Sequence, residues 1–397
     1  MLLEQPDNFS FTAESSNPSV VLSSIGDEKK IEVPHAVDTT YLSHAYFRFI
    51  GKFPPQILAY LMNRHSLQGP LLDPMCGGGT SLVEALLRGI EATGLDVNPV
   101  SVLFSRVVSL PILPELAGTR VSAFLTTLRN SEMYEAPDSL FKLNVKRLKF
   151  CDQYFSDLTK SQVNKALEIA KQEENSAIRE FLSAAILAVL RKVSRANIKK
   201  MNLEIDDEKS PPKALYPVLA KQLELMLLKN RQLYSATSDS RGITVSEGRA
   251  DATGLPDGSF QTVVLHPPYL TNTAYSEFTQ LQLAVLEIDH KDIWKRELRC
   301  RGSFLHEPNG LQKYLLNWNR ILAESFRVLA HGGKMVVIVG DGQIDYTRIP
   351  VGAITEQFAG DIGFNVLEKM SHVLNNNTGR TQSRKMVGQH VLVFEKQ

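Results

Sequence analysis

The chain has 397 residues, of which 43% are hydrophobic and 22% are charged, and its formal net charge is +1. This composition is ordinary for a soluble globular protein with one large domain or two smaller ones. The longest mostly apolar run, residues 181–190, is too short to span a membrane, and the N-terminus lacks the pattern of a signal peptide. The three cysteines lie far apart, which excludes a disulfide framework and a CxxC metal site and favours a cytoplasmic protein.

The N-terminal part of the chain changes from polar to regularly patterned sequence. Residues 1–30 are rich in Ser, Asn and acidic residues, so we expect a flexible arm there. A short apolar helix at residues 57–62 follows two prolines. LLDP (71–74) then marks the end of a buried strand, CGGGT (76–80) a glycine turn, and SLVEALLRG (81–89) an amphipathic helix with a glycine stop.

A second strand pattern, EATGLDVNP (91–99), ends at Asp96. Asn98 can cap the helix that follows, and Pro99 suits the first turn of that helix. The two strands and the helix between them form a β-turn-α-β unit. Such a unit predicts the start of a parallel, doubly wound sheet.

The sequence pattern predicts helices in the middle of the chain and mainly strands in its last third. Helix patterns lie at residues 116–129, 160–173, 176–197 and 213–233. Strand patterns return at residues 243–248, 262–268, 334–340, 364–369 and 390–396. The last two strands can pair antiparallel across the polar loop between them. Seven strand patterns in all predict an α/β fold with a doubly wound, mostly parallel sheet.

The glycine turn and Asp96 suit a ligand that carries a ribose. Glycines let the backbone approach a ligand without Cβ clashes, and an acid about 20 residues further on, at the end of the next strand, can bind ribose hydroxyls. Alone, the turn is equally well a tight strand-to-helix connection, and Asp96 a helix-capping acid. There is no GK[ST] sequence here, which disfavours a phosphate-binding P-loop.

DPMCGGGTSLVEALLRGIEATGLDVNP (73–99) resembles the first two motifs of the S-adenosylmethionine (SAM)-dependent DNA amino-methyltransferases, the N4-cytosine and N6-adenine group. The resemblance implies a seven-stranded, Rossmann-like methyltransferase sheet and SAM as the cofactor. It implies that the Gly77–Thr80 turn wraps the amino-acid part of SAM and that Asp96 binds its ribose. Residues 31–103 and 243–397 would form the catalytic domain, with residues 104–242 as a helical insertion.

Two further segments are similar to the same family. SHAYFRFIGKFPPQIL (43–58) is similar to the motif before the glycine turn, which implies that it closes over the methionine end of SAM. Asp251 matches a position that contacts the adenine. The alternatives are core packing for the first segment and an exposed loop acid for the second. The candidate cofactor residues are His44, Tyr46, Lys52, Phe53, Asp73, Met75, Cys76, Gly77, Gly79, Thr80, Asp96, Asn98 and Asp251.

The candidate catalytic motif is His266-Pro267-Pro268-Tyr269, directly after an apolar strand. In the family it reads Asp, Asn or Ser, then Pro-Pro and an aromatic residue. An exocyclic amine is a poor nucleophile, so a side chain and a backbone carbonyl must each accept one of its N–H hydrogen bonds. The prolines fix the backbone, and the resemblance implies that the aromatic ring stacks on a base flipped out of the duplex. Methyl transfer is then direct and needs no metal.

His266 departs from the family at the first motif position. A neutral imidazole accepts one hydrogen bond and a protonated one accepts none, so activity should fall at acid pH if His266 is the acceptor. The alternative for the motif is a rigid strand-to-loop turn with a packed tyrosine. The flanking segments 270–286, 323–341 and 383–396 also resemble the family, so the resemblance covers roughly residues 40–102 and 243–396.

The insertion is a candidate target-recognition region, or equally a helical cap on the sheet. Basic residues gather at its centre, after the catalytic motif and in the late polar loop, and they are candidates for phosphate contact. Charge runs also mark solvated surfaces. The candidate nucleic-acid-binding residues are Arg191, Lys192, Arg195, Lys295, Arg296, Arg299, Arg301, Arg380, Arg384 and Lys385.

These observations favour methylation of an exocyclic amine in double-stranded DNA, with N4-cytosine ahead of N6-adenine. A restriction or defence-system partner would fit this reading. One alternative is an RNA base methyltransferase of the guanine-N2 type, which the glycine turn also resembles. A second alternative is a non-catalytic SAM-binding subunit of a larger complex, which the unusual His266 suggests.

Overall fold

The computed structural model describes residues 20–25, 28–34, 36–49, 51–131, 145–200, 203–206, 214–237, 242–270, 275–300, 303–373 and 389–397. Nine of its strands form a single sheet in the order β1-β2-β10-β11-β7-β6-β3-β4-β5. They are β1 (Val21–Ile25), β2 (Glu28–Glu32), β3 (Leu71–Asp73), β4 (Ala92–Asp96), β5 (Ile243–Glu247), β6 (Phe260–Leu265), β7 (Leu329–Gly340), β10 (Phe364–Val373) and β11 (Gln389–Lys396). A separate hairpin consists of β8 (Gly342–Ile344) and β9 (Thr347–Ile349).

The pairing of the strands confirms the predicted doubly wound sheet. Strands β7, β6, β3, β4 and β5 are parallel neighbours. Strand β11 runs antiparallel to both β7 and β10, as predicted for the last two strands of the chain. The chain first builds outward from β3 through β4 to β5 and then returns to add β6 and β7 on the other side. The reversal beside β3 creates a crevice at the carboxyl ends of β3 and β6, where α/β proteins bind ligands.

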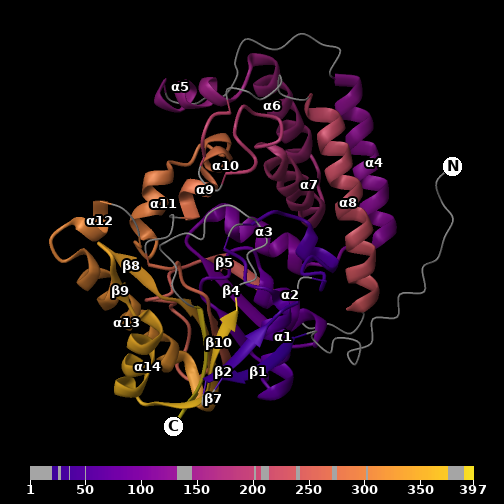
Figure 1. Cartoon of the computed structure of the whole chain (residues 1–397). Coiled ribbons are helices and arrows are strands. Elements are labelled where there is room, and N and C mark those ends of the chain that lie inside the picture. Colours follow the sequence, from indigo (N-terminus) through magenta and orange to yellow (C-terminus); the bar gives the residue numbers. More distant parts are fainter. Residues whose placement is uncertain are drawn as a thin grey trace.

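Helices cover both faces of the sheet (Figure 1). On one face Ile57, Leu61 and Leu82 pack with alternate strand residues such as Val336 and Ile338. These helix residues belong to α1 (Pro55–Arg64) and α2 (Thr80–Leu87), and α3 (Pro99–Ser109) joins the same face. On the other face the intervening strand residues pack against α13 (Gly310–Val328) and α14 (Val351–Ile362). This alternation along each strand buries the sheet on both sides.

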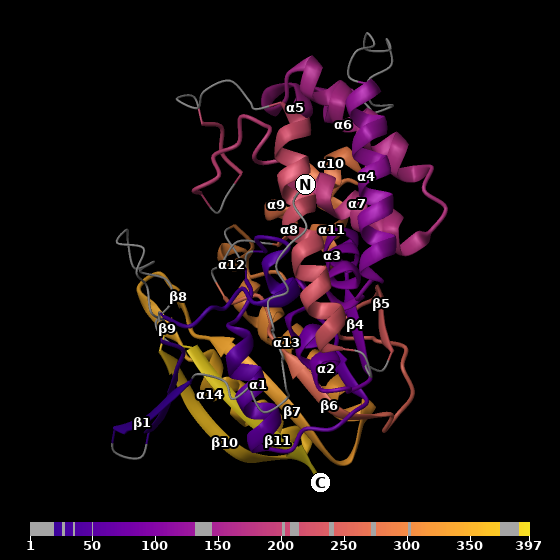
Figure 2. The ribbon, with the colours of Figure 1, turned by 90° about the vertical axis from the view of Figure 1, so that its right-hand side faces the viewer.

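The helices inserted between β4 and β5 stand above the sheet (Figure 2). They are α4 (Pro114–Ser131), α5 (Val145–Tyr154), α6 (Asp157–Lys171), α7 (Ser176–Val189) and α8 (Leu215–Ala236). Helices α4, α6 and α8 lie within a few residues of the predicted helices, whereas α7 ends eight residues before the predicted end at residue 197, and α5 was not predicted. Their core is continuous with α3, with Tyr46 and Phe47, and with Leu281 and Leu283 after the catalytic motif. The insertion is therefore packed onto the catalytic half through a shared core.

Shorter helices complete the fold. They are the 3₁₀ helix η1 (Leu42–Ala45), α9 (Tyr275–Phe278), α10 (Gln280–Val285), α11 (His290–Arg296) and α12 (Ser303–His306). Helices α9 to α11 follow the candidate catalytic motif and lie between the sheet and the insertion (Figure 1). In the part of the chain that is described, no helix combines the length and apolar character needed to cross a membrane.

The predicted flexible arm is wrong for residues 21–25 and 28–30. These residues form the hairpin of β1 and β2, and β2 adds to the sheet edge by pairing parallel with β10. The buried side chain of Ile31 and an ion pair between Lys29 and Glu368 at 2.9 Å fix this hairpin. Pairing partners more than 300 residues away explain why local composition did not predict it. Residues 1–19 of the predicted arm lie outside the described residues.

Candidate functional site

The glycine turn is bound to the ends of two neighbouring strands. Asp73, the last residue of β3, accepts hydrogen bonds from the Met75 amide at 3.0 Å and from the Ser81 hydroxyl. Asp96, the last residue of β4, accepts from the Gly77 amide at 2.9 Å and from the Asn98 amide at 2.8 Å. The two carboxylates therefore hold the backbone between β3 and α2 in a fixed path.

The segment before α1 packs directly on this turn. A Cβ atom on Gly78 would lie 2.7 Å from Lys52 Cε and 2.9 Å from Phe49 Cγ. Gly79 begins α2 in the left-handed conformation, with φ of 78°. Glycine is required at both positions, since one lacks space for a side chain and the other adopts a conformation that L-residues rarely occupy. Phe49 and Lys52 thus form a lid over the turn.

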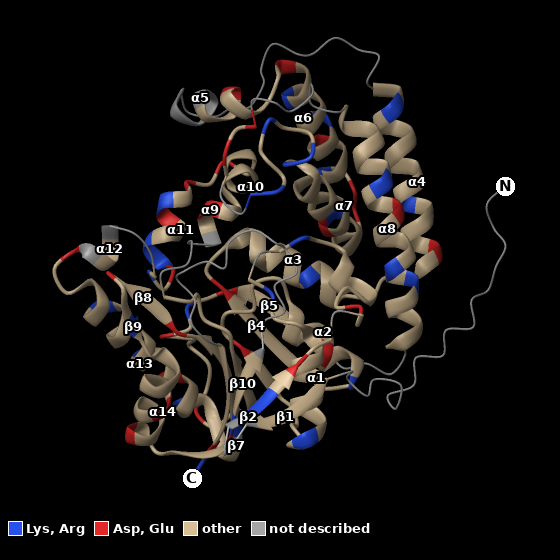
Figure 3. Ribbon diagram, in the orientation of Figure 1, with Lys and Arg blue, Asp and Glu red and all other residues tan. Residues whose placement is uncertain are grey.

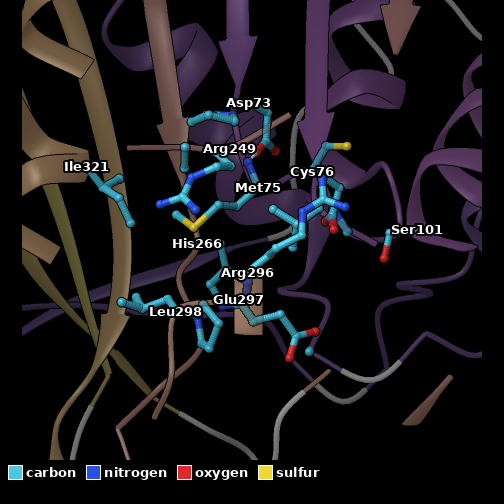
Figure 4. Close-up of a pocket in the computed structure, with 18 of the residues that line it drawn as sticks. Asp73, Met75, Cys76, Ser101, Arg249, His266, Arg296, Glu297, Leu298 and Ile321 are labelled. Atoms are coloured by element: carbon cyan, nitrogen blue, oxygen red, sulfur yellow. Dashed lines mark hydrogen bonds between the residues drawn. The ribbon is translucent and has the colours of Figure 1, made fainter. Parts of the chain in front are cut away.

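Together these parts enclose a cavity of about 160 Å³ at the carboxyl ends of the central strands (Figure 4). Figure 4 shows Asp73, Met75 and Cys76 on one side of it and His266, Arg296 and Glu297 facing them across the space. The cavity brings together eleven of the candidate cofactor and catalytic residues, from three separate stretches of sequence. They are Lys52, Phe53, Asp73, Met75, Cys76, Gly77, Thr80, Asp96, Asp251, His266 and Pro268.

Burial sets the charge state of the polar groups in this cavity. Burial raises the pKa of Asp96 to about 6, although the hydrogen bonds from the Asn98 and Gly77 amides lower it. It raises the pKa of Asp73 to about 7. Burial also lowers the pKa of the Lys52 ammonium to about 8, and Lys52 Nζ donates only to the carbonyls of His44 and Phe47, at 3.3 and 3.4 Å, among the contacts described. The cavity holds an ammonium and a carboxylate that are each poised to gain a ligand.

His266 sits at the other end of the cavity in a chain of hydrogen bonds. Its Nε2 lies 2.9 Å from the Tyr269 hydroxyl, and its ring also bonds to the Gly51 backbone. The Gln389 amide donates to the Tyr269 hydroxyl, and His372 donates to the Gln389 carbonyl oxygen. Burial, with a smaller contribution from His372, lowers the pKa of His266 to about 4. The imidazole is therefore neutral at physiological pH.

Tyr269 is not placed where stacking on a flipped base would need it. Its ring is 8% exposed and packs against β7, where a Cβ on Gly340 would lie 2.7 Å from Tyr269 Cδ2. Neither Tyr269 nor Pro267 lines the cavity. The expected stacking role of Tyr269 is thus not met in this structure, because the absence of a side chain at Gly340 opens a slot that takes the ring.

His44 and Tyr46 also lie away from the cavity, contrary to the expectation from their motif. The His44 ring is buried and lies 3.0 Å from Glu84 of α2, which also accepts from Tyr41 and pairs with Arg88 at 2.8 Å. This cluster anchors η1 to α2 and thereby positions the lid over the glycine turn. Gly79 and Asn98 do not line the cavity either. The Asn98 side chain caps α3, as predicted, where its Oδ1 accepts from the Val100 amide at 3.1 Å, and its Nδ2 donates to the Thr279 hydroxyl at 2.9 Å.

The predicted nucleic-acid-binding residues separate into three groups. Lys295, Arg296 and Arg299 line the first cavity itself, and Arg299 stacks on Trp294 with its guanidinium 3.8 Å from the ring centre. Arg191 and Lys192 line a second cavity beneath the insertion, and Arg195 follows them, exposed, in the basic segment after α7 (Figure 3). The remaining candidates, Arg301, Arg380, Arg384 and Lys385, lie outside the described residues.

Arg249, Glu297 and Phe49 are among the cavity residues that were not named as candidates. Arg249 forms a two-pronged contact with both oxygens of Asp251, at 2.9 and 2.7 Å. Glu297 accepts from the amide and hydroxyl of Ser276 at 2.7 and 2.9 Å, and burial raises its pKa to about 7. Phe49 belongs to the lid. Arg249 stands two residues before Asp251 after a predicted strand, and Phe49 lies in the predicted lid segment 43–58, so both had a sequence signal, whereas Glu297 had none.

The three cysteines are free and buried. Within the described ranges, no cluster of His, Cys, Asp or Glu side chains is suited to hold a metal ion. Burial raises the pKa of the Cys76 thiol well above its usual range, which makes it a poor nucleophile.

Comparison with known proteins finds sequence similarity to methyltransferases. No protein-family model matches the chain. The chain is 25% identical over 277 residues to the Type II methyltransferase M.MvaI of Kocuria varians, an alignment that covers 64% of this chain and 60% of that protein. It is 23% identical over 385 residues to the Type II methyltransferase M.AvaI of Nostoc sp., which covers 81% and 77% of the two chains.

Solved structures give low overall similarity. TTHA0409 of Thermus thermophilus in complex with S-adenosyl-L-methionine matches 38% of this chain and 53% of that chain at 22% identity, with a TM-score of 0.23. A SAM-dependent methyltransferase of Methanosarcina mazei matches 84% and 96% at 11% identity, with a TM-score of 0.30. The strand order of this chain therefore carries the fold assignment. The chain is similar in sequence to Type II methyltransferases, and its predicted resemblance to SAM-dependent DNA methyltransferases is confirmed.

Proposed function

We propose that this protein transfers the methyl group of SAM to an exocyclic amino group of a DNA base, with N4 of cytosine ahead of N6 of adenine. The observation that carries the proposal is the shared cavity. The glycine turn and Asp96 line one end of it, and His266 and Pro268 line the other. A cofactor bound at the first end has its reactive group within the same enclosure as the candidate transfer motif, which is what direct transfer requires.

The polar groups of the cavity match the parts of SAM. Asp96 would accept hydrogen bonds from the ribose hydroxyls, since it is a strand-end carboxylate of the kind that binds ribose in nucleotide-binding folds. Lys52 would pair with the methionine carboxylate, because its buried ammonium has only neutral carbonyl partners among the described contacts. Asp251, held by Arg249, stands where the adenine contact is expected. When bound, SAM supplies the electrophilic methyl group.

The transfer end must accept two N–H hydrogen bonds from the amine. Pro268 lines the cavity, and its carbonyl accepts one hydrogen bond, from the Tyr314 hydroxyl at 3.4 Å. A carbonyl oxygen has two lone pairs, so the Pro268 carbonyl is the backbone acceptor in our proposal. The side-chain acceptor would be His266 Nε2, which is neutral because burial lowers its pKa to about 4. In this structure Nε2 lies against the Tyr269 hydroxyl. The base must therefore displace Tyr269 from His266 as it enters, and the released ring can then stack on it.

A second candidate function follows from the same contact. With Tyr269 seated against His266, the acceptor of the amine is blocked. A protein that keeps this arrangement would bind SAM without transferring its methyl group, as expected for a non-catalytic subunit. An RNA base methyltransferase is the other alternative to be tested.

The test is transfer of a labelled methyl group from SAM to duplex DNA and, in parallel, to tRNA, with the modified nucleosides identified by mass spectrometry. We expect N4-methylcytosine in DNA, with N6-methyladenine as the result that would change the assigned base. Label in RNA alone would refute a DNA substrate. Tight cofactor binding without transfer to either nucleic acid would favour the non-catalytic subunit. Long-read sequencing of DNA from cells that express the protein would then give the recognition sequence.

A further inference from the structure

A second cavity of about 190 Å³ lies between the insertion and the catalytic half. It is far larger than the roughly 10–15 Å³ that one water molecule needs. The segment around Tyr46 forms one wall, and α7, α8 and α10 supply the others (Figure 1). Phe49, which lines the first cavity, lines this one as well. The two cavities are therefore neighbours, separated by the lid segment.

The walls of the second cavity are largely aromatic. Phe47 and Phe104 stack on each other with ring centres 4.2 Å apart and 18° between their planes. Tyr46 packs edge-on against Phe47, with ring centres 5.8 Å apart. Phe278, directly after the candidate catalytic loop, completes this lining. Flat apolar surfaces of this kind bind planar rings, and base–aromatic stacking is sequence-tolerant.

Two buried polar atoms of the lining lack a hydrogen-bond partner among the described residues. They are the Tyr46 hydroxyl, on a residue that is 2% exposed, and Gln282 Oε1, on a residue that is 7% exposed. The amide nitrogen of Gln282 donates to the Leu187 carbonyl at 3.3 Å, which fixes its oxygen as a free acceptor. A buried polar group without a partner is costly. The pair is explained if a ligand supplies the missing partners.

The rim of the second cavity is positively charged. Arg48, Arg191 and Lys192 all line it. Arg48 donates to the Ile198 carbonyl at 2.6 Å and Lys192 to the Gln222 side-chain oxygen at 3.2 Å, and both of these acceptors are neutral. Burial lowers the pKa of Arg191, and the nearby charge of Arg48 lowers it further. Cations that repel one another at the mouth of a cavity favour an anionic ligand.

We propose that the second cavity binds one nucleotide, with its base between the aromatic walls and its phosphate at the basic rim. The Tyr46 hydroxyl and the Gln282 oxygen have almost no accessible surface in this structure, so the two side chains must turn toward the cavity as the base enters and would then hydrogen-bond its edge. Since the cavity adjoins the proposed transfer site, its occupant is a nucleotide near the target in the substrate strand. The inference rests on the proposed function for the identity of that strand. A free nucleotide has the same chemistry, and the test separates the two sources.

Two substitutions probe the two ends of the cavity. Tyr46→Phe removes only the unpartnered hydroxyl, and Arg48→Gln removes one charge at the rim. Arg231→Gln is the matched control, because Arg231 is exposed on α8 nine residues, or about 13 Å, beyond the lining residue Gln222. Binding of S-adenosylhomocysteine by calorimetry is measured for every variant. An unchanged affinity shows that the fold and the first cavity are intact.

The main measurement is the dissociation constant of a fluorescent duplex and of a single-stranded oligonucleotide, with the protein saturated with S-adenosylhomocysteine. We expect Arg48→Gln to weaken binding about tenfold and to reduce its salt dependence, and Tyr46→Phe to weaken binding about threefold. The control should bind like the wild type. Titrations with dCMP and dAMP identify the source. Effects confined to these mononucleotides indicate a free nucleotide, and effects confined to oligonucleotides indicate the substrate strand.

Oligonucleotide and mononucleotide binding that is the same in both variants as in the wild type would overturn the proposal. Equal weakening by the control Arg231→Gln would also overturn it, since it would reveal only nonspecific charge attraction. The readout is binding and not catalysis, so it is independent of the proposed reaction. In one outcome the wild type transfers no methyl group to DNA while the variants still lose nucleotide affinity. That result would refute the proposed function and support the second cavity as a nucleotide site.

Discussion

The two ends of the first cavity are held in place in different ways. At the cofactor end, Asp96 accepts from the backbone amides of Gly77 and Asn98, within 20 residues of itself. At the transfer end, His266 depends on Tyr269, which in turn depends on Gln389, 120 residues further along the chain. Local sequence therefore sets the first end, and distant strands set the second. Substitutions at the first end should abolish function outright, whereas those at the second should reveal which contacts change when a base enters.

The largest effect is expected at the cofactor end. Asp96→Ala removes the proposed ribose acceptors and the partner of the Gly77 amide. Two lost charge-assisted hydrogen bonds correspond to a roughly 10²- to 10⁴-fold weaker affinity for S-adenosylhomocysteine, measured by calorimetry. Asp361→Ala, which changes an exposed acid on α14, is the control and should bind normally. An Asp96→Ala protein that binds within threefold of the wild type would contradict this placement of the ribose.

At the transfer end, His266→Ala should lower kcat about a hundredfold, the usual loss when one positioned acceptor or donor is removed from a reacting group. Affinity for S-adenosylhomocysteine should stay the same. His266→Asn restores a residue type of the related family and should keep kcat within about tenfold of the wild type. Equal losses in both variants would show that His266 acts by holding Tyr269 and does not accept the amine.

The affinity for S-adenosylhomocysteine should form a plateau in pH. Below pH 6 the Asp96 carboxyl, with its pKa raised to about 6, gains a proton and no longer accepts ribose hydroxyls in full. Above pH 8 Lys52, with its pKa lowered to about 8, loses the proton that pairs with the cofactor carboxylate. One unit beyond either limit should cost about tenfold in affinity. Lys52→Met should remove only the alkaline decline, and a decline that persists would exclude Lys52 from that role.

The smallest effect concerns the pH dependence of kcat at saturating cofactor. Because burial lowers the pKa of His266 to about 4, kcat should change less than twofold between pH 6 and 8 and fall only as the pH approaches 4. The fall in activity that we expect at acid pH for a histidine acceptor is therefore placed below the ordinary imidazole range. Steady-state rates across this range test it. A decline in kcat centred between pH 6 and 7 that disappears in His266→Asn would contradict this prediction, because it would show that His266 is protonated at a higher pH than its burial implies.

Sequence patterns predicted most of the architecture. The seven central strands, the glycine turn and Asp96 follow from residues within about 30 positions of one another. Hydrophobic period, glycine and capping residues act at that range. The same holds for α4, α6 and α8 of the insertion, which the sequence shows as amphipathic patterns, whereas α5 was not predicted and the predicted end of α7 was eight residues too late.

Only the tertiary structure decided the remaining features of the site. Tyr269 lies inward because Gly340, on another strand, leaves room for its ring. His44 belongs to Glu84 of α2 and not to the cofactor, and Glu297 enters the cavity to hold the start of α9. In each case the deciding partner is a side chain brought close by packing. The sequence gives the identity of each residue. The contribution of its side chain to stability or binding depends on contacts with residues that are brought close only when the chain folds.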